Sequence, residues 1–381
     1  MLKIIPLGGL GEIGLNMMVF DYGDTLFVVD AGLMFPEDYM LGVDFVIPDM
    51  DYLRQNQSRV AGIVLTHAHE DHIGALPYLL KDLKAPVFGT TFTLGLVRQK
   101  LEEYDRLGST ALHSILPEEK LKLGPFTLEF IRVGHSVIDG VGIAIQTPVG
   151  RIIHTGDFKI GYGSVDGMAT DVNKFAKFGE EGVLVLLSDS TNVEREGYPI
   201  SDKEICETLM RVTTGSSGRV IVALFASNIA RIQVILDIAK ANGKKIIFAG
   251  KSIEDSVRIA RQLGYLDTTD SKIISIDEVA DYDDEEITAT TYTEEREYKK
   301  GTSWCKWLSL FIRPKVVRAL DISFSAEVGP RKGSWKGGTV GHGIDMLPGE
   351  NHESAFRRYC KKGYKARDNK TYPLTFIKKE K

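Results

Sequence analysis

Four potential metal ligands lie within six residues in the first quarter of the chain: His67, His69, Asp71 and His72. The chain has only eight histidines, and three of them fall in this hexapeptide. Imidazole and carboxylate together suit zinc or manganese. Alternating residues can point His67 and His69 at one ion while Asp71 and His72 face its neighbour. The spacing therefore predicts the beginning of a site for two metal ions.

The elements on either side of this cluster would hold it in place. The apolar run 61–65 directly before it is typical of a buried strand. The segment 75–83 after it is expected to form a helix, with Pro77 in the first turn, where a missing N–H costs little. The ligands would then lie on a rigid loop between two regular elements, as a preorganised site requires.

Further ligands are expected at the ends of later strands. Residues 126–133 alternate as a strand and end in Gly134-His135, and residues 150–155 do the same and end in Gly156-Asp157. In both segments the glycine lets the backbone turn, so the next side chain can point into a shared cleft. Because a carboxylate has two oxygens, Asp157 could bridge two cations.

Three other residues near this pattern are expected to play supporting roles. Asp30 follows the strand 27–29 and could hydrogen-bond the second ring nitrogen of a ligand histidine. We expect His154, inside a strand, and His113, in a helical stretch, to be structural rather than ligating.

The composition is that of a soluble protein long enough for two domains. No apolar stretch approaches a membrane span, so membrane insertion and secretion are not expected. Three scattered cysteines fit a reducing cytoplasm. The charge changes sharply along the chain: residues 1–287 carry 27 basic and 42 acidic residues, net −15, whereas residues 288–381 carry 20 and 10, net +10.

The order of Asp30, the histidine cluster, Gly-His135 and Gly-Asp157 resembles the metallo-β-lactamase superfamily, whose fold is an αβ/βα sandwich with a binuclear metal site along its edge. Longer segments resemble the ribonuclease J family of its β-CASP branch over residues 2–287. These segments are Pro6–Asn16, Asp30–Pro36, Leu41–Asp49, Leu187–Asn192 and Phe225–Asn228.

The resemblance implies an α/β fold with three parts. We expect a metallo-β-lactamase domain over residues 1–200 and a partial β-CASP domain over residues 201–287. Residues 288–381 would form a basic, poorly ordered tail, because their apolar residues show no sustained period. The β-CASP sheet begun by strands 220–224 and 245–249 is expected to lack its continuation.

The activity that the resemblance implies is hydrolysis of RNA by two divalent ions, zinc or manganese, in the cytoplasm. Asp71 and Asp189 would be catalytic, and the metal ligands would be His67, His69, Asp71, His72, His135 and Asp157. The substrate would be single-stranded RNA with a 5′-monophosphate, cut internally or from that end. A homo-oligomer or an RNA-degradation complex would be a further partner.

Two more sites follow from the same resemblance. Ala226, Ser227 and Asn228 would contact RNA near its 5′ phosphate, and the alternative is a plain helix cap by Ser227 and Asn228. The loop with Gly42 and Asp44 resembles the place where some members hold a structural cation, which would be calcium.

The tail departs from the family, because two later histidine motifs are absent and the residues around His342 and His352 do not match them. The second metal would then be held weakly and the ribonuclease would be impaired. Two alternatives remain open: a small-molecule metallohydrolase of the same superfamily, or a non-catalytic RNA-binding remnant.

Overall fold

The computed structural model describes residues 1–36, 40, 42–160, 169–194, 202–214, 216, 218–283, 286–292, 364–365 and 371–372. The chain divides into two compact units, Met1–Ser325 and Ala326–Lys381. In the second unit the described residues form two short antiparallel strands, β15 (Tyr364–Lys365) and β16 (Thr371–Tyr372). Within the described residues no helix has the length and apolar character needed to cross a bilayer.

The first sheet has six strands in sequence order. They are β1 (Leu2–Gly8), β2 (Met17–Tyr22), β3 (Thr25–Val29), β4 (Val60–Val64), β5 (Val87–Gly89) and β6 (Leu112–Ser114). β1, β2 and β3 pair antiparallel and form a meander. β3, β4, β5 and β6 pair parallel, so the segments that connect them cross over through helices. His113 lies in β6, so its predicted helical setting was wrong.

The second sheet is built from the next five strands. They are β7 (Lys120–Leu123), β8 (Phe126–Arg132), β9 (Val141–Thr147), β10 (Gly150–His154) and β11 (Val185–Leu187), in the order β11-β10-β9-β8-β7. Fully buried side chains from both sheets form one core, in which the rings of Phe27 and Phe126 lie 5.0 Å apart. Alternation explains this core, since Phe27 faces the second sheet while its neighbour Val28 joins the other cluster.

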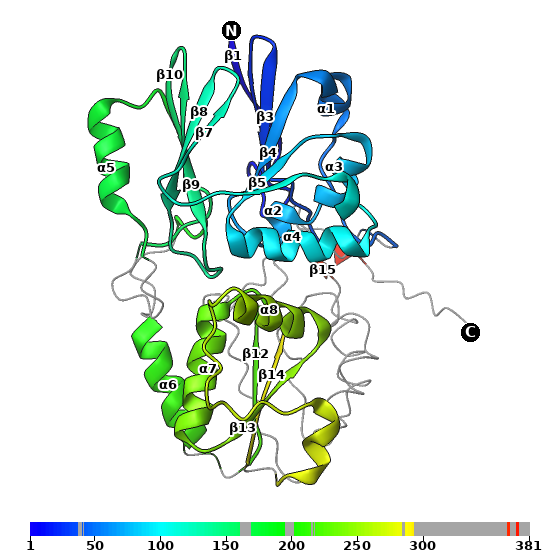
Figure 1. The fold of residues 1–381 in the computed structure, drawn as a ribbon, viewed down its shortest axis with the longest axis vertical. Coiled ribbons are helices and arrows are strands. Elements are labelled where there is room, and N and C mark those ends of the chain that lie inside the picture. The colour runs from blue at the N-terminus through cyan, green and yellow to red at the C-terminus, as the bar shows by residue number, and fades with distance from the viewer. Residues whose placement is uncertain are drawn as a thin grey trace. The chain divides into compact units, whose positions relative to one another are not determined.

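Helices cover the outer face of each sheet (Figure 1). The first sheet is covered by α1 (Asp51–Gln55), α3 (Leu76–Asp82) and α4 (Thr91–Glu103). Buried side chains of these helices and of the sheet form a second core cluster. Phe178 of α5 (Val172–Glu181) packs on Ile153 of the second sheet. Short 3-10 turns lie at Gln57–Arg59 and Leu107–Ser109. The predicted αβ/βα sandwich is confirmed.

A third, all-parallel sheet follows in the chain. Its strands are β12 (Val220–Leu224), β14 (Ile287–Tyr292) and β13 (Lys245–Ala249), with α6 (Asp202–Thr214), α7 (Ile229–Ala241), α8 (Lys251–Gln262) and a 3-10 helix at Ile276–Asp281. β14 lies between the other two strands and begins at Ile287, the last residue of the predicted partial domain. The sheet therefore continues where the sequence predicted that it would stop. Most of the tail beyond β14 lies outside the described residues.

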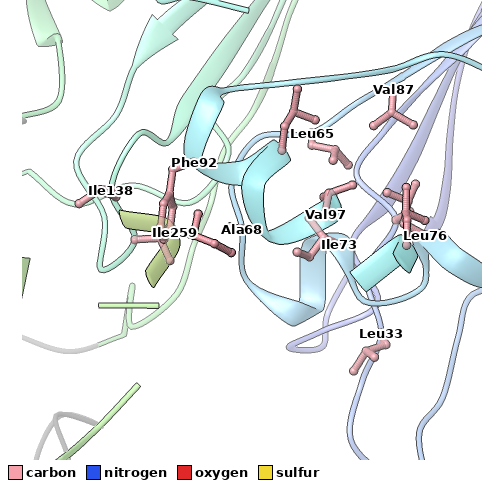
Figure 2. Close-up of a cluster of buried hydrophobic side chains, with 14 of the residues drawn as sticks. Leu33, Leu65, Ala68, Ile73, Leu76, Val87, Phe92, Val97, Ile138 and Ile259 are labelled. Atoms are coloured by element: carbon pink, nitrogen blue, oxygen red, sulfur yellow. The ribbon is translucent and has the colours of Figure 1, made fainter. Parts of the chain in front are cut away.

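Side chains of this third layer join the large core cluster of the first sheet (Figure 2). Ile259 of α8 is buried with Phe92 of α4 and with Ile138, which follows β8. The approach of α8 to α4 depends on Gly95, because a Cβ there would lie 2.7 Å from the Ile259 side chain.

Candidate metal centre

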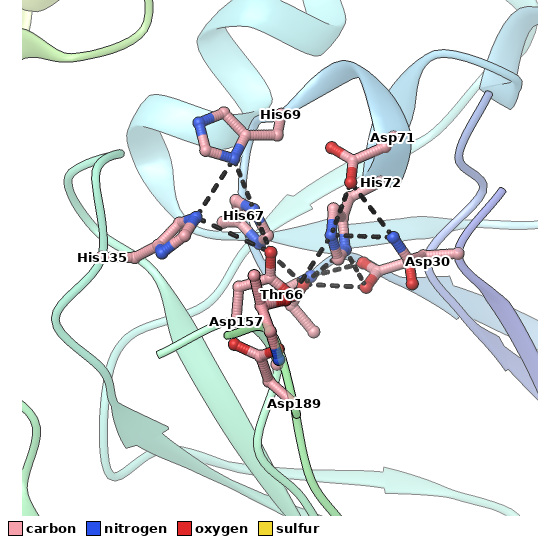
Figure 3. A network of polar contacts seen from close by, with 12 residues as sticks. Asp30, Thr66, His67, His69, Asp71, His72, His135, Asp157 and Asp189 are labelled. Carbon is pink, nitrogen blue, oxygen red and sulfur yellow. Dashed lines mark hydrogen bonds and ion pairs between the residues drawn. The ribbon is translucent and has the colours of Figure 1, made fainter. Parts of the chain in front are cut away.

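The predicted ligands converge from three strand ends (Figure 3). His67 and His69 follow β4, His135 follows β8, and Asp157 follows β10. Asp71 and His72 lie in α2 (Glu70–Ile73), a one-turn helix, and not on the loop that the sequence predicted. This turn fixes their backbone by hydrogen bonds from His72 N and Ile73 N to His69 O, both 2.9 Å.

Four ligand atoms form a first group from His67, His69, His135 and Asp157. His69 Nδ1 lies 3.0 Å from His67 Nε2 and 3.2 Å from His135 Nε2, and Asp157 Oδ2 lies 3.7 Å from His135 Nε2. Two nitrogens bound to one tetrahedral zinc ion stand about 3.3 Å apart, given zinc–nitrogen bonds of about 2.05 Å. The nitrogen spacing therefore fits a divalent cation.

A second group is formed by Asp71, His72 and Asp157. His72 Nε2 lies 3.6 Å from Asp71 Oδ2 and 3.5 Å from Asp157 Oδ1. Asp157 thus turns one oxygen toward each group, as a bridging carboxylate would. The structure divides the six predicted ligands into groups of four and three that share Asp157, and the His/Asp cluster is suited to divalent metal binding.

Buried hydrogen bonds orient the histidines of the site. Asp30 is 1% exposed; its Oδ2 lies 2.8 Å from His72 Nδ1 and accepts the Thr66 hydroxyl, also at 2.8 Å. Thr66 N donates to Asp30 Oδ1 at 2.7 Å, and Thr66 Oγ1 lies 3.1 Å from His67 Nδ1. A donating Nδ1 leaves Nε2 of His72 free for a metal. Asp30 therefore has the orienting position that the sequence predicted.

Three supporting residues, Asn16, Ser136 and Thr66, were absent from the sequence prediction. Asn16 Nδ2 lies 3.3 Å from Asp71 Oδ2 and 3.1 Å from His72 Nε2, and Ser136 Oγ lies 3.3 Å from His69 Nε2. Asn16 directly precedes β2, and a polar residue beside a strand end was the signal that could have identified it. Thr66 gave no separate signal, since threonine is common in strands.

Glycine at position 32 permits the close packing behind α2. A Cβ there would lie 1.6 Å from the carbonyl oxygen of Asp71. Gly32 N donates to Asn16 O at 2.9 Å, and Asn16 N donates to Asp71 O at 3.1 Å. The backbone that follows β3 is therefore tied to the turn that carries Asp71.

Three of the imidazoles have lowered basicity. Burial lowers the pKa of His67 and His135 and lowers that of His69 to about 3, and nearby imidazoles add to the effect. These rings are neutral near neutral pH, which is the form that binds a metal.

His72 is in the opposite situation. Burial lowers its pKa, but the carboxylates of Asp30, Asp71 and Asp157 outweigh burial and hold the pKa well above its usual range. Burial raises the pKa of Asp157, yet the His72 hydrogen bond and the surrounding imidazoles hold it at about 2. The field around His72 thus favours positive charge, which a divalent cation would provide.

The remaining predicted residues lie outside the two ligand groups. Asp189 follows β11; its N–H donates to Thr155 Oγ1 at 3.0 Å and its Oδ1 accepts from Thr191 N at 2.8 Å. Asn228 caps α7, because its side chain accepts from Arg231 N at 3.1 Å.

The other four predicted positions are loop residues. Ala226 and Ser227 are half-buried just before α7. Gly42 and Asp44 are exposed before the short bridge between Met34 and Val46, and Gly42 has a φ of 84°. Their cation site stays a prediction.

Comparison with known proteins gives two family matches. The model of the metallo-β-lactamase superfamily matches residues 10–173, which contain all the metal-ligand candidates. A second family, described as CBASS inhibitor Acb3, matches residues 243–364. The two matches share no residue.

Curated relatives match a longer part of the chain. It is 46% identical over 292 residues to ribonuclease J of Thermus thermophilus, covering 75% of this chain and 51% of that protein. It is 43% identical over 289 residues to ribonuclease J2 of Bacillus subtilis, covering 76% of this chain and 52% of that protein. The chain therefore spans about half the length of these relatives.

A solved structure shares the fold at low sequence identity. A protein of unknown function from Enterococcus faecalis V583 superposes with a TM-score of 0.56 at 16% identity, covering 78% of each chain.

Proposed function

About three quarters of this chain is homologous to ribonuclease J and contains a metallo-β-lactamase domain, and from this premise we propose that the protein is a metal-dependent ribonuclease. One observation carries the proposal: the two ligand groups meet at Asp157 inside the part of the chain that matches the superfamily. The reaction is hydrolysis of a phosphodiester in RNA.

The first group would hold one divalent cation and the second group another. When bound, the two cations supply Lewis acidity toward a phosphodiester and lower the pKa of water. The nitrogen-rich first group favours zinc, and the carboxylate-rich second group also suits manganese. A calcium ion at Gly42 and Asp44 would be structural.

Asp71 is the proton acceptor in this proposal. Its side chain is 30% exposed, so it can reach water while Asn16 holds it at Oδ2. Asp189 would act beside the first group. Its negative charge raises the pKa of His135, although burial has the larger effect and lowers that pKa.

The substrate of this proposal is single-stranded RNA with a 5′-monophosphate, cut internally or from the 5′ end, in rRNA and mRNA processing and decay. Its phosphate would lie near Ala226, Ser227 and Asn228, because a helix N-terminus favours an anion. The Asn228 side chain already caps this helix, so the phosphate would use the remaining N–H groups. The protein would act in the cytoplasm, as an oligomer or in an RNA-degradation complex.

Two other functions compete with this one. A small-molecule metallohydrolase would use the same metal centre, and a non-catalytic RNA-binding protein would use only the third sheet. The identity to ribonuclease J extends over more residues than the metallo-β-lactamase match, which favours RNA over a small substrate.

The test is hydrolysis of 5′-monophosphorylated single-stranded RNA by the wild-type chain with zinc or manganese. Asp71→Asn keeps the shape of the side chain but removes its charge, and we expect activity to fall by at least a hundredfold, roughly the effect of losing a general base. The matched control is Asp24→Asn, at an exposed turn residue. Equal rates in wild type and Asp71→Asn would refute the role of Asp71. Cleavage of small esters without cleavage of RNA would favour the small-molecule metallohydrolase. Binding of RNA without hydrolysis would favour the non-catalytic RNA-binding protein.

A further inference from the structure

The loop that carries His135 is closed at its base. Val133 N donates to Gly140 O at 3.1 Å, so residues 134–139 form a compact excursion between β8 and β9. Asp139 is the last residue of this loop and has a φ of 65°, a conformation that aspartate and asparagine tolerate better than most residues. Asp139 and His135 therefore lie in the same short, closed loop.

The Asp139 carboxylate is held from two directions. Its Oδ2 accepts Phe92 N, at the beginning of α4, at 3.2 Å and the hydroxyl of Tyr265, which follows α8, at 3.0 Å. The Phe92 and Tyr265 rings also meet edge to face, with centroids 6.1 Å apart. Burial and the Asp139 charge raise the pKa of Tyr265, so its hydroxyl keeps its proton and donates.

Around this contact the packing is apolar and tight. Phe92 is fully buried and Ile138, next to Asp139, is 4% exposed; Figure 2 shows both beside Ile259 of α8. The Tyr265 hydroxyl is thus a specific polar link beside a hydrophobic contact, and both Tyr265 and Asp139 are half-buried.

Helix α4 also contacts the other metal-binding segment, which carries His67 to His72. Lys100 of α4 donates to Glu70, the residue between His69 and Asp71, at 2.8 Å. The same helix contacts α8 through Glu103 and Lys251, whose charged groups lie 2.7 Å apart. Both metal-binding segments are therefore anchored to the helix on which α8 packs.

We propose that Asp139 and Tyr265 are positioning residues, through which the segment that follows α8 sets the position of His135 in the metal centre. The proposal rests on the proposed function, because it assigns His135 a metal. It predicts that Tyr265, far from any ligand in sequence, influences how well the first group binds its cation.

Tyr265→Phe is the decisive variant, because it removes the hydroxyl and keeps the ring that packs on Phe92. Tyr104→Phe is the matched control, since it removes a tyrosine hydroxyl that lies 2.8 Å from the Tyr78 hydroxyl at the other end of α4. Asp139→Asn is the conservative variant, because its amide oxygen can still accept from Tyr265 and its backbone tolerates the positive φ.

Two measurements on the whole chain separate the possible results. Amide hydrogen exchange of residues 134–140, without metal, should be faster in Tyr265→Phe by roughly three- to tenfold, the effect of one lost hydrogen bond. Titration with cobalt(II), followed by its visible absorption, should show an altered spectrum and an affinity lower by a similar factor. Tyr104→Phe should match wild type in both measurements, and Asp139→Asn should lie between wild type and Tyr265→Phe.

Unchanged exchange in residues 134–140 of Tyr265→Phe would overturn the proposal, and so would an unchanged cobalt spectrum and affinity. Failure of wild type to bind cobalt(II) at all would instead overturn the metal centre and the proposed function. The exchange measurement would still decide whether Tyr265 holds the His135 loop.

Discussion

Replacing Asp30 by Asn should damage the second metal group more than the first. Asp30 Oδ1 accepts Thr66 N, and Asp30 Oδ2 receives both the Thr66 hydroxyl and His72 Nδ1. An Asn at this position keeps the φ of 61° at low cost and must place its oxygen toward Thr66 N. Its NH₂ then faces His72 Nδ1, which can accept only when the ring proton is on Nε2. That tautomer blocks the nitrogen that faces Asp71 and Asp157.

The expected size of this effect follows from the same contacts. Loss of an orienting partner behind a ligand histidine lowers metal affinity roughly 10- to 100-fold. Loss of one charge-assisted hydrogen bond costs about 2 kcal/mol of folding stability. The first group should change less, because His67 is connected to Asp30 only through Thr66.

Competitive titration with a chromophoric zinc chelator measures both affinities, and urea unfolding measures stability. Asp24→Asn serves as the control, since Asp24 is exposed. The reasoning is refuted if Asp30→Asn binds the second ion as tightly as wild type, or if both groups weaken by the same factor.

Three further predictions follow from the site. After dialysis the protein should retain one metal ion per chain, because the first group has four ligands and the second has three; elemental analysis showing two tightly held ions would contradict this ligand count. As the pH rises toward the raised pKa of His72, the affinity for the second ion should increase by about tenfold per pH unit, because the ion must displace one proton. Above that pKa the affinity should level off. First-group binding, with its lowered histidine pKa values, should be flat near neutral pH, and titrations from pH 6 to 9 test both. Gly32→Ala should lower stability by roughly 3 kcal/mol because its Cβ meets the Asp71 carbonyl, whereas Gly108→Ala, with open space around it, should be neutral in urea unfolding.

The sequence alone predicted the candidate ligands and most of the elements that carry them. Period-two alternation predicted the strand 126–133, which the structure ends at Arg132, and the strands predicted in the apolar runs Val220–Leu224 and Lys245–Ala249 have the same bounds in the structure. Glycine before His135 and before Asp157 indicated turns at strand ends. These signals are local, because strand alternation and turn chemistry depend on neighbouring residues.

Only the tertiary structure decided the contacts between distant segments. Asn16 reaches Asp71 across 55 residues, and Tyr265 reaches Asp139 across 126. The order β12-β14-β13 also escaped the sequence, because a parallel strand can insert between two earlier ones without any local mark of its neighbours. Which oxygen of Asp157 faces which group, and which nitrogen of His72 is free, depends on packing of several strand ends, and no spacing along the chain encodes it.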